Sequence, residues 1–148
     1  MPIIKATEPV TKAPIDVIVG TPEELVRWYH KHGRKDFEQK DKVAGHANRL
    51  HKDGAVYFLA WFLCEDLKKG VALRTIVHEC FHLYAYVCGT MQGSEYFSID
   101  SSDNEDDAYH FANLFEEIEH AVQKGLNRIA KSKWQTPGLY NTSKRVYY

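Results

Sequence analysis

One short stretch of this 148-residue chain has residue types and spacing suited to metal-assisted chemistry, His78-Glu79-x-x-His82. On an α-helix, residues four apart lie about 40° apart around the axis and about 6 Å apart along it. Both imidazoles therefore lie on one face, close enough to share a tetrahedral Zn2+ ion. Glu79 lies about 100° from His78, where a carboxylate can act as general base on water beside the metal.

The residues around this motif predict a helix buried on most sides. Its flanking positions are uncharged, and the stripe that carries the two histidines continues through small residues. The alternative is a buried helix in which both histidines and Glu79 are satisfied without a metal. A carboxylate and two imidazoles in an apolar segment are costly unless something pairs them, which favours the metal. The flanking residues are Ile76, Val77, Cys80, Phe81, Leu83 and Tyr84, and the small ones are Thr75, Ala85 and Gly89.

Residues 75–84 resemble the extended HExxH pattern of the zincin metallopeptidases, with uncharged flanks and a hydrophobic last position. The metzincin continuation is excluded, because Ala85 and Cys88 stand where a glycine and a third histidine are needed. A zinc site of this type needs one more protein ligand. We therefore expect the third ligand on a second helix.

The candidates for the third ligand lie in an acidic cluster that opens a long helix expected over 104–130. Apolar residues recur there at helical spacing, and Glu105 falls at the border of the expected buried face, beside Ala108 and Ala112. We predict Glu105 as the ligand, while the alternative that the acids only complement the helix dipole stays open. The remaining candidates, expected on the solvated side or before the helix, are Asp103, Asp106, Asp107 and His110.

The same region carries a second resemblance. Asn104-Glu105 is similar to the gluzincin continuation, and Glu105-x-x-Ala108-x-x-Phe111-Ala112 resembles the second motif of ImmA/IrrE-type metallopeptidases. Small metallopeptidase-like proteins of bacteriophages have a similar layout. The resemblance covers about residues 55–115 and implies a minimal zincin-like domain with Glu105 as third ligand. Unlike the ImmA/IrrE-type proteins, the sequence shows no DNA-binding module. Tyr109 and Tyr140 are the candidates for the residue that stabilises a transition state.

The sequence predicts one α+β domain over 1–148, in which a small antiparallel sheet packs on the HExxH helix and a long C-terminal helix. Thr21, Pro22 and Glu24 form a capping box that starts the first helix, and His30 and His32 are expected at its C-terminal end. His46 and His51 are expected at the surface of a hairpin. The expected segments are an extended lead-in over 1–14, a strand over 15–19, a helix over 21–32, a hairpin of 43–50 with 55–62 through a turn at 51–54, the HExxH helix over 71–88 closed by Gly89, a loop over 90–101, the helix over 104–130 and a tail over 131–148.

Composition argues against several classes of function. The net charge is −1, so no basic surface for nucleic acid is expected, and no apolar run is long enough to span a membrane. The N-terminus has no apolar signal-peptide core. Three cysteines cannot all pair, and we expect Cys64, Cys80 and Cys88 to be reduced core residues of a cytoplasmic protein.

The leading hypothesis is a zinc-dependent peptide hydrolase. Zinc held by His78, His82 and Glu105 would acidify a bound water that Glu79 deprotonates, and a peptide or protein substrate would pair with an edge strand at 55–62. One rival is a metal-binding interaction module on the zincin scaffold without peptidase activity, as in a viral protein that holds a host partner. The other is a metal-free interaction domain. The sequence indicates neither the substrate nor the oligomeric state.

Overall fold

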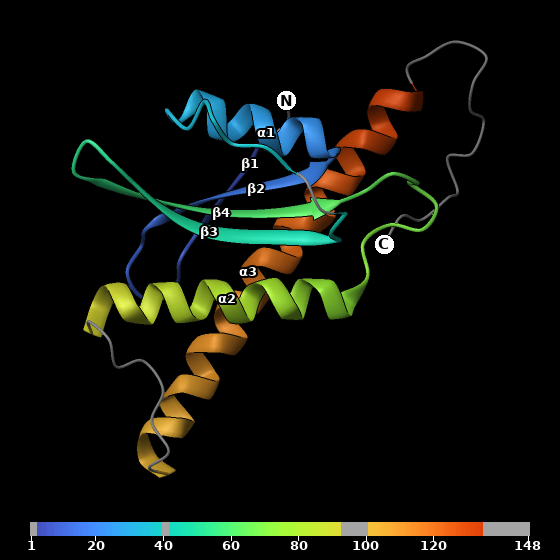
Figure 1. Ribbon diagram of the computed structural model, residues 1–148. Coiled ribbons are helices and arrows are strands. Elements are labelled where there is room, and N and C mark those ends of the chain that lie inside the picture. Colours follow the sequence, from blue (N-terminus) through green and yellow to red (C-terminus); the bar gives the residue numbers. More distant parts are fainter. Residues whose placement is uncertain (1–2, 40–41, 93–100, 135–148) are drawn as a thin grey trace.

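The computed structural model describes residues 3–39, 42–92 and 101–134 (Figure 1). It is an α+β structure in three layers. One helix covers one face of a four-stranded sheet, and two helices cover the other face. The elements are β1 (Ile4–Thr7), β2 (Pro14–Gly20), α1 (Pro22–Lys31), β3 (Gly45–Lys52), β4 (Ala55–Leu63), α2 (Leu73–Gln92) and α3 (Ser101–Trp134).

The sheet is mixed, with strand order β1-β2-β4-β3. β1 pairs with β2 and β3 pairs with β4 in antiparallel fashion, whereas β2 and β4 are parallel. The prediction of an antiparallel sheet was therefore wrong at its centre. The chain leaves β2, crosses one face as α1 and re-enters through the β3–β4 hairpin, and a crossover of this kind is what joins parallel strands.

The segment expected as an extended lead-in over 1–14 contains the strand β1 and the turn into β2. The turn includes Lys12 in the left-handed region, with a φ of 63°. The fully buried Glu8 stabilises this turn, since its Oε1 accepts hydrogen bonds from the amides of Val10 (3.0 Å) and Thr11 (2.7 Å). The prolines of this segment made a strand hard to predict. β1 forms because it pairs with β2, and His110 of α3 contacts Glu8 just after it.

Both faces of the two central strands are buried, and their side chains alternate between two apolar clusters. The cluster under α2 and α3 takes Ile15, Val17 and Val19 of β2 with Phe58, Ala60 and Phe62 of β4. The cluster under α1 takes Ile18, Leu59 and Trp61. This alternation follows from the two-residue period of a strand. It keeps the sheet rigid beneath the helices on both sides.

The helix α1 begins as expected. Thr21 and Glu24 form a capping box, with Pro22 in the first turn. At the other end, the Nδ1 of His32 lies 2.8 Å from the Trp28 carbonyl oxygen, which confirms that this histidine serves the helix terminus. The indole of Trp28 donates to Asp16 of β2 at 2.8 Å, which locks α1 onto the sheet.

The two later helices are longer than predicted. α2 passes through Gly89 and ends at Gln92, so this glycine does not close the helix. A glycine inside a helix costs about 1 kcal/mol, which burial of Val87 and Cys88 just before it readily offsets. α3 extends beyond the predicted 104–130 at both ends. Residues 90–92 and 101 of the loop expected over 90–101 belong to these helices, as do residues 131–134 of the tail expected over 131–148. Residues 93–100 and 135–148 lie outside the described residues.

Polar contacts, not only apolar ones, anchor the first half of α3. The Tyr84 hydroxyl donates to Asp107 at 2.5 Å, and the Nε2 of His110 lies 2.7 Å from the Glu8 carboxylate. The pKa of Tyr84 is raised by burial and by its bond to Asp107. The expectation that Asp107 and His110 lie on the solvated side was therefore wrong. Ala108, which was expected to be buried, is exposed.

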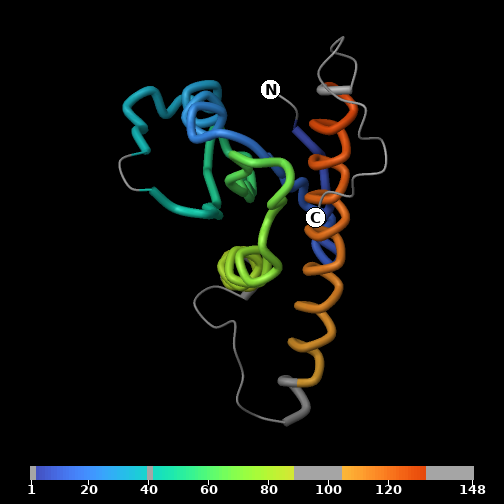
Figure 2. The backbone as a smooth tube through the Cα atoms, turned by 90° about the vertical axis from the view of Figure 1, so that its right-hand side faces the viewer, coloured from blue at the N-terminus to red at the C-terminus, as the bar shows by residue number. Residues whose placement is uncertain are grey.

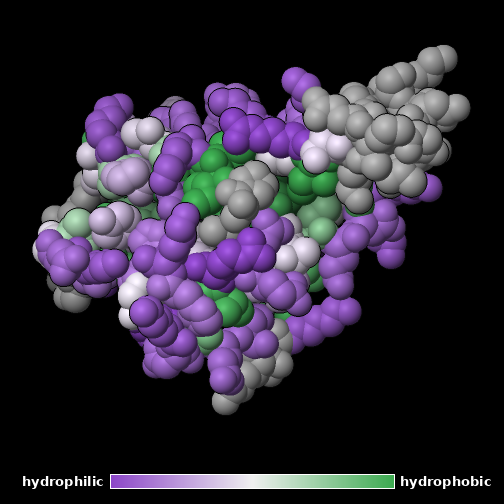
Figure 3. All heavy atoms as spheres, turned by 90° about the horizontal axis from the view of Figure 1, so that it is seen from above, coloured by the Kyte–Doolittle hydropathy of each residue, from purple (hydrophilic) through white to green (hydrophobic). Residues whose placement is uncertain are grey.

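The rotation of α3 thus follows polar partners that lie far away in the sequence. Figure 2 shows α3 running past α2, which is seen nearly end-on, and continuing beyond it. The face seen from above is largely hydrophilic where the structure describes it, and hydrophobic residues are visible there in patches between hydrophilic ones (Figure 3). Within the described ranges, no helix combines the length and apolar character needed to cross a membrane.

Candidate metal and acid–base site

The two histidines of the motif lie together on the exposed face of α2. Their Nε2 atoms are 3.2 Å apart, and the two ring planes are inclined at 78°. Zn–N bonds of about 2.0–2.1 Å in a tetrahedral site place two ligand nitrogens roughly 3.3 Å apart. The side chains therefore stand at the separation that a shared zinc ion requires, and both are open to solvent.

Glu79 lies beside this pair but is buried. Only 5% of the residue is exposed, and among the residues that the structure describes it makes no hydrogen bond or ion pair. Burial raises the pKa of Glu79, and the nearby His78 offsets part of the rise. A buried carboxylate without a partner is costly to a fold. Such a group with a raised pKa is characteristic of a site that moves protons.

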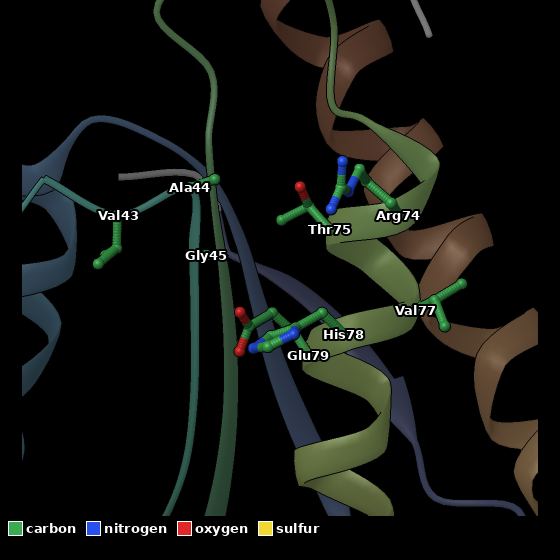
Figure 4. Close-up of a pocket in the computed structure, with 8 residues that line it drawn as sticks. All are labelled: Val43, Ala44, Gly45, Arg74, Thr75, Val77, His78 and Glu79. Carbon is green, nitrogen blue, oxygen red and sulfur yellow. The ribbon is translucent and has the colours of Figure 1, made fainter.

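A cavity of about 560 Å³ opens beside Glu79 and His78. Its walls are the start of β3 with the residues just before it, 43–45, and the first turns of α2 (Figure 4). In the close-up, the side chains of His78 and Glu79 point from α2 towards β3. The cavity therefore lies between an acid–base group and a strand.

That strand is β3, which forms one edge of the sheet. We expected the edge strand at 55–62, but this segment is β4, which pairs with β2 on one side and β3 on the other. The hairpin itself was predicted correctly, and its turn has Asp53 and Gly54 at φ of 53° and 78°. Strand order depends on β2, far away in the sequence, and the hairpin alone did not indicate it.

The close approach of β3 to the site depends on Gly45, which the sequence analysis missed. A Cβ at this position would lie 2.8 Å from Cγ and 2.9 Å from Oε2 of Glu79, and 3.0 Å from a methyl of Thr75. Only glycine leaves room for the carboxylate there. The contact joins residues 34 positions apart, so no local signal in the sequence marks it.

Gly45→Ala is therefore expected to displace the Glu79 carboxylate without unfolding the chain. A misplacement of about 1 Å can cost on the order of 100-fold in rate, so a reaction that uses Glu79 as its base should slow about 10- to 100-fold, while the spacing of the two histidines should not change. The control is His51→Ala, at an exposed position farther along β3. An unchanged rate in Gly45→Ala would contradict this role.

The structure does not bring Glu105 to the histidine pair. Glu105 is exposed, and α3 meets α2 through Tyr84, about 200° around α2 from His82. Across the described part of the chain, no group of three or more His, Cys, Asp or Glu side chains is close enough to hold a metal ion. The two histidines fit zinc, and a third protein ligand stays a prediction.

The other candidate residues have different surroundings. His46 is half-buried, not at the surface as expected, and its Nε2 lies 2.6 Å from the Tyr29 hydroxyl. Burial, with a smaller effect of His82, lowers the pKa of His46. His51 is exposed, as predicted. Tyr109 is 64% exposed, and Tyr140 lies outside the described residues.

Within the described residues, no disulfide joins any of the three cysteines. Cys80 and Cys88 are buried in the core beneath α2, and Cys64 is half-buried. Burial raises the pKa of Cys80 to about 12, with smaller contributions from Glu79 and Glu119. A thiol with this pKa is not a nucleophile near neutral pH, because the thiolate is the reactive form.

Comparison with known proteins gave no match. No family, curated protein or solved structure matched the chain. The site therefore has to be interpreted from its own residues and geometry.

Proposed function

We propose that this protein is a zinc-dependent peptide hydrolase of the zincin type. One observation carries the proposal: a buried carboxylate without a partner, Glu79, lies beside two histidines whose Nε2 atoms are 3.2 Å apart. A histidine pair at this separation suits zinc, and a carboxylate next to it suits a general base. His78 and His82 would hold the ion, and Glu105, the third ligand expected from the sequence, does not lie with them in the structure.

The roles of the residues follow from their positions. Zinc, when bound, supplies a Lewis acid that polarises the peptide carbonyl and acidifies water. Glu79 takes the proton from the attacking water and gives it to the leaving amine. Its raised pKa suits it to hold that proton between the two transfers. Because β3 is an edge strand, one of its sides has no partner strand, and an extended peptide would add to the sheet there as a fifth strand.

A second candidate is a metal-binding interaction module without peptidase activity. Apolar side chains exposed on α2 near the histidines favour it, since Val77 is 42% and Phe81 51% exposed. Exposed apolar groups of this kind often contact a partner. The buried carboxylate favours the enzyme, because a site that only holds a metal needs no base.

Metal analysis and a cleavage assay test the proposal together. Purified protein is expected to contain about one zinc per chain, and the zinc-loaded form should cleave casein or a diverse peptide library. A chelator should stop cleavage, and added zinc should restore it. Protein that neither contains nor takes up zinc would refute both candidates, whereas zinc without cleavage would favour the interaction module.

A further inference from the structure

The cavity beside Glu79 has a positive side chain in its wall. Arg74 lies there, one helical turn before His78 and about 6 Å from it along the axis of α2. In Figure 4 its guanidinium lies beside Thr75, above His78 and Glu79. Arg74 is exposed, and over the described ranges it forms no ion pair or hydrogen bond. A guanidinium matches the fork geometry of a carboxylate.

The backbone at this end of α2 adds to the positive potential. Ala72 precedes the helix and has no side-chain oxygen that can cap it, although its carbonyl accepts from the amides of Thr75 (3.0 Å) and Ile76 (3.2 Å). The first turn contains no acidic residue. No side chain there offsets the partial positive charge of the helix N-terminus.

A helix N-terminus and one arginine do not by themselves define a ligand site. The independent observation is Glu79, a polar side chain that is 95% buried, has no partner in the described part of the chain and reaches the same cavity. The cavity therefore joins a candidate catalytic base to a candidate anion-binding end. A ligand that spans both would be a peptide with a carboxylate close to the reacting bond.

Strand direction indicates which end of a peptide reaches Arg74. β3 and α2 run the same way, because Gly45 lies against Thr75 and Glu79 while Arg49 donates to the Tyr86 carbonyl at 3.3 Å (Figure 1). A peptide that pairs with β3 in antiparallel fashion therefore runs from the histidines towards Arg74 in its C-terminal direction. Antiparallel pairing is the slightly more stable arrangement.

The length of the ligand between the two groups can be estimated. Arg74 and Glu79 are five residues apart on α2, or about 7.5 Å along its axis. An extended peptide covers about 3.4 Å per residue. The carboxylate would lie about two residues from the bond that is cleaved.

We propose that Arg74, with the N-terminus of α2, binds a carboxylate on the C-terminal side of the bond that is cleaved, about two residues away. This inference rests on the proposed function and names a substrate class for the site. The carboxylate belongs either to the C-terminus of the peptide or to an Asp or Glu side chain. Both sources present the same chemistry to the guanidinium, and the experiment separates them.

Binding to full-length, zinc-loaded Glu79→Gln protein tests the proposal without turnover. The probes are N-acetylated pentapeptides of alanine and leucine in three forms: a free C-terminal carboxylate, a C-terminal amide, and an amide with glutamate as last residue. Calorimetry or fluorescence gives each Kd. At least one acidic probe should bind about tenfold more tightly than the neutral amide. Adding Arg74→Gln should remove this difference, and adding Arg74→Lys should retain part of it.

Arg128→Gln, which changes an exposed arginine on α3, is the matched control and should preserve the difference. A preference for the free C-terminus assigns the carboxylate to the chain end, and a preference for the glutamate amide assigns it to a side chain. Equal binding of all three probes, absent binding, or a preference that survives Arg74→Gln overturns the inference. If the parent and Arg74→Gln cleave peptides equally well in the presence of zinc, the role of Arg74 is overturned. The proposed hydrolase would still stand in that case. Carboxylate-dependent binding without any hydrolysis would retain the Arg74 site and refute the hydrolase.

Discussion

Replacing Glu79 with glutamine is expected to lower peptide cleavage by about 10²–10⁴-fold, the usual contribution of a general base. Glutamine keeps the size of the side chain and its hydrogen-bonding capacity but removes its basicity. Zinc content should not change, because Glu79 is assigned to the proton transfer and not to the metal. Single-turnover cleavage of the best peptide from the library, together with zinc analysis of the same sample, measures both quantities.

The fold of the Glu79→Gln variant should be at least as stable as the parent near neutral pH. Glu79 is buried without a partner, so its charge is a cost to the folded state that the amide removes. Glu119→Gln, at an exposed position on α3, is the matched control and should cleave at the parental rate. Parental cleavage by Glu79→Gln would remove Glu79 from the mechanism.

Replacing His82 or His78 with alanine is expected to abolish tight zinc binding. Each change removes half of the pair whose nitrogens are 3.2 Å apart. In the parent, zinc at 100 times its Kd should stabilise the folded chain by about 2.7 kcal/mol, since it binds the folded state preferentially. Thermal unfolding with and without zinc should show a rise in Tm for the parent and none for either variant.

His51→Ala is the control for loss of a histidine, because His51 is exposed on β3 and makes no part of the pair. It should keep both the zinc content and the zinc-dependent Tm. An unchanged zinc response in both His78→Ala and His82→Ala would show that the pair is not the metal site. Glu105→Ala, measured in the same way, decides the third ligand: loss of affinity assigns Glu105, and unchanged affinity excludes it.

Features that depend on local spacing could be predicted from the amino-acid sequence. The capping box of Thr21 and Glu24, the β3–β4 hairpin and the helical HExxH motif each involve residues within a few positions of one another. The common face of His78 and His82 follows from helix geometry alone, and the 3.2 Å separation of their Nε2 atoms agrees with it. Such features can be predicted because the chain itself holds the interacting groups close together.

Contacts between segments that are far apart in the sequence could not be predicted and are known from the folded chain. The fold placed β2 parallel to β4, made β3 the edge strand and left space for Glu79 through Gly45. It also rotated α3 so that Asp107 and His110 face inward while Glu105 is exposed. The apolar periodicity of α3 did not indicate this rotation, because the partners of its first turns are Tyr84 of α2 and Glu8 after β1. A buried polar group forms its hydrogen bond with a residue that the fold places beside it. When that residue is far away in the sequence, no local pattern indicates it.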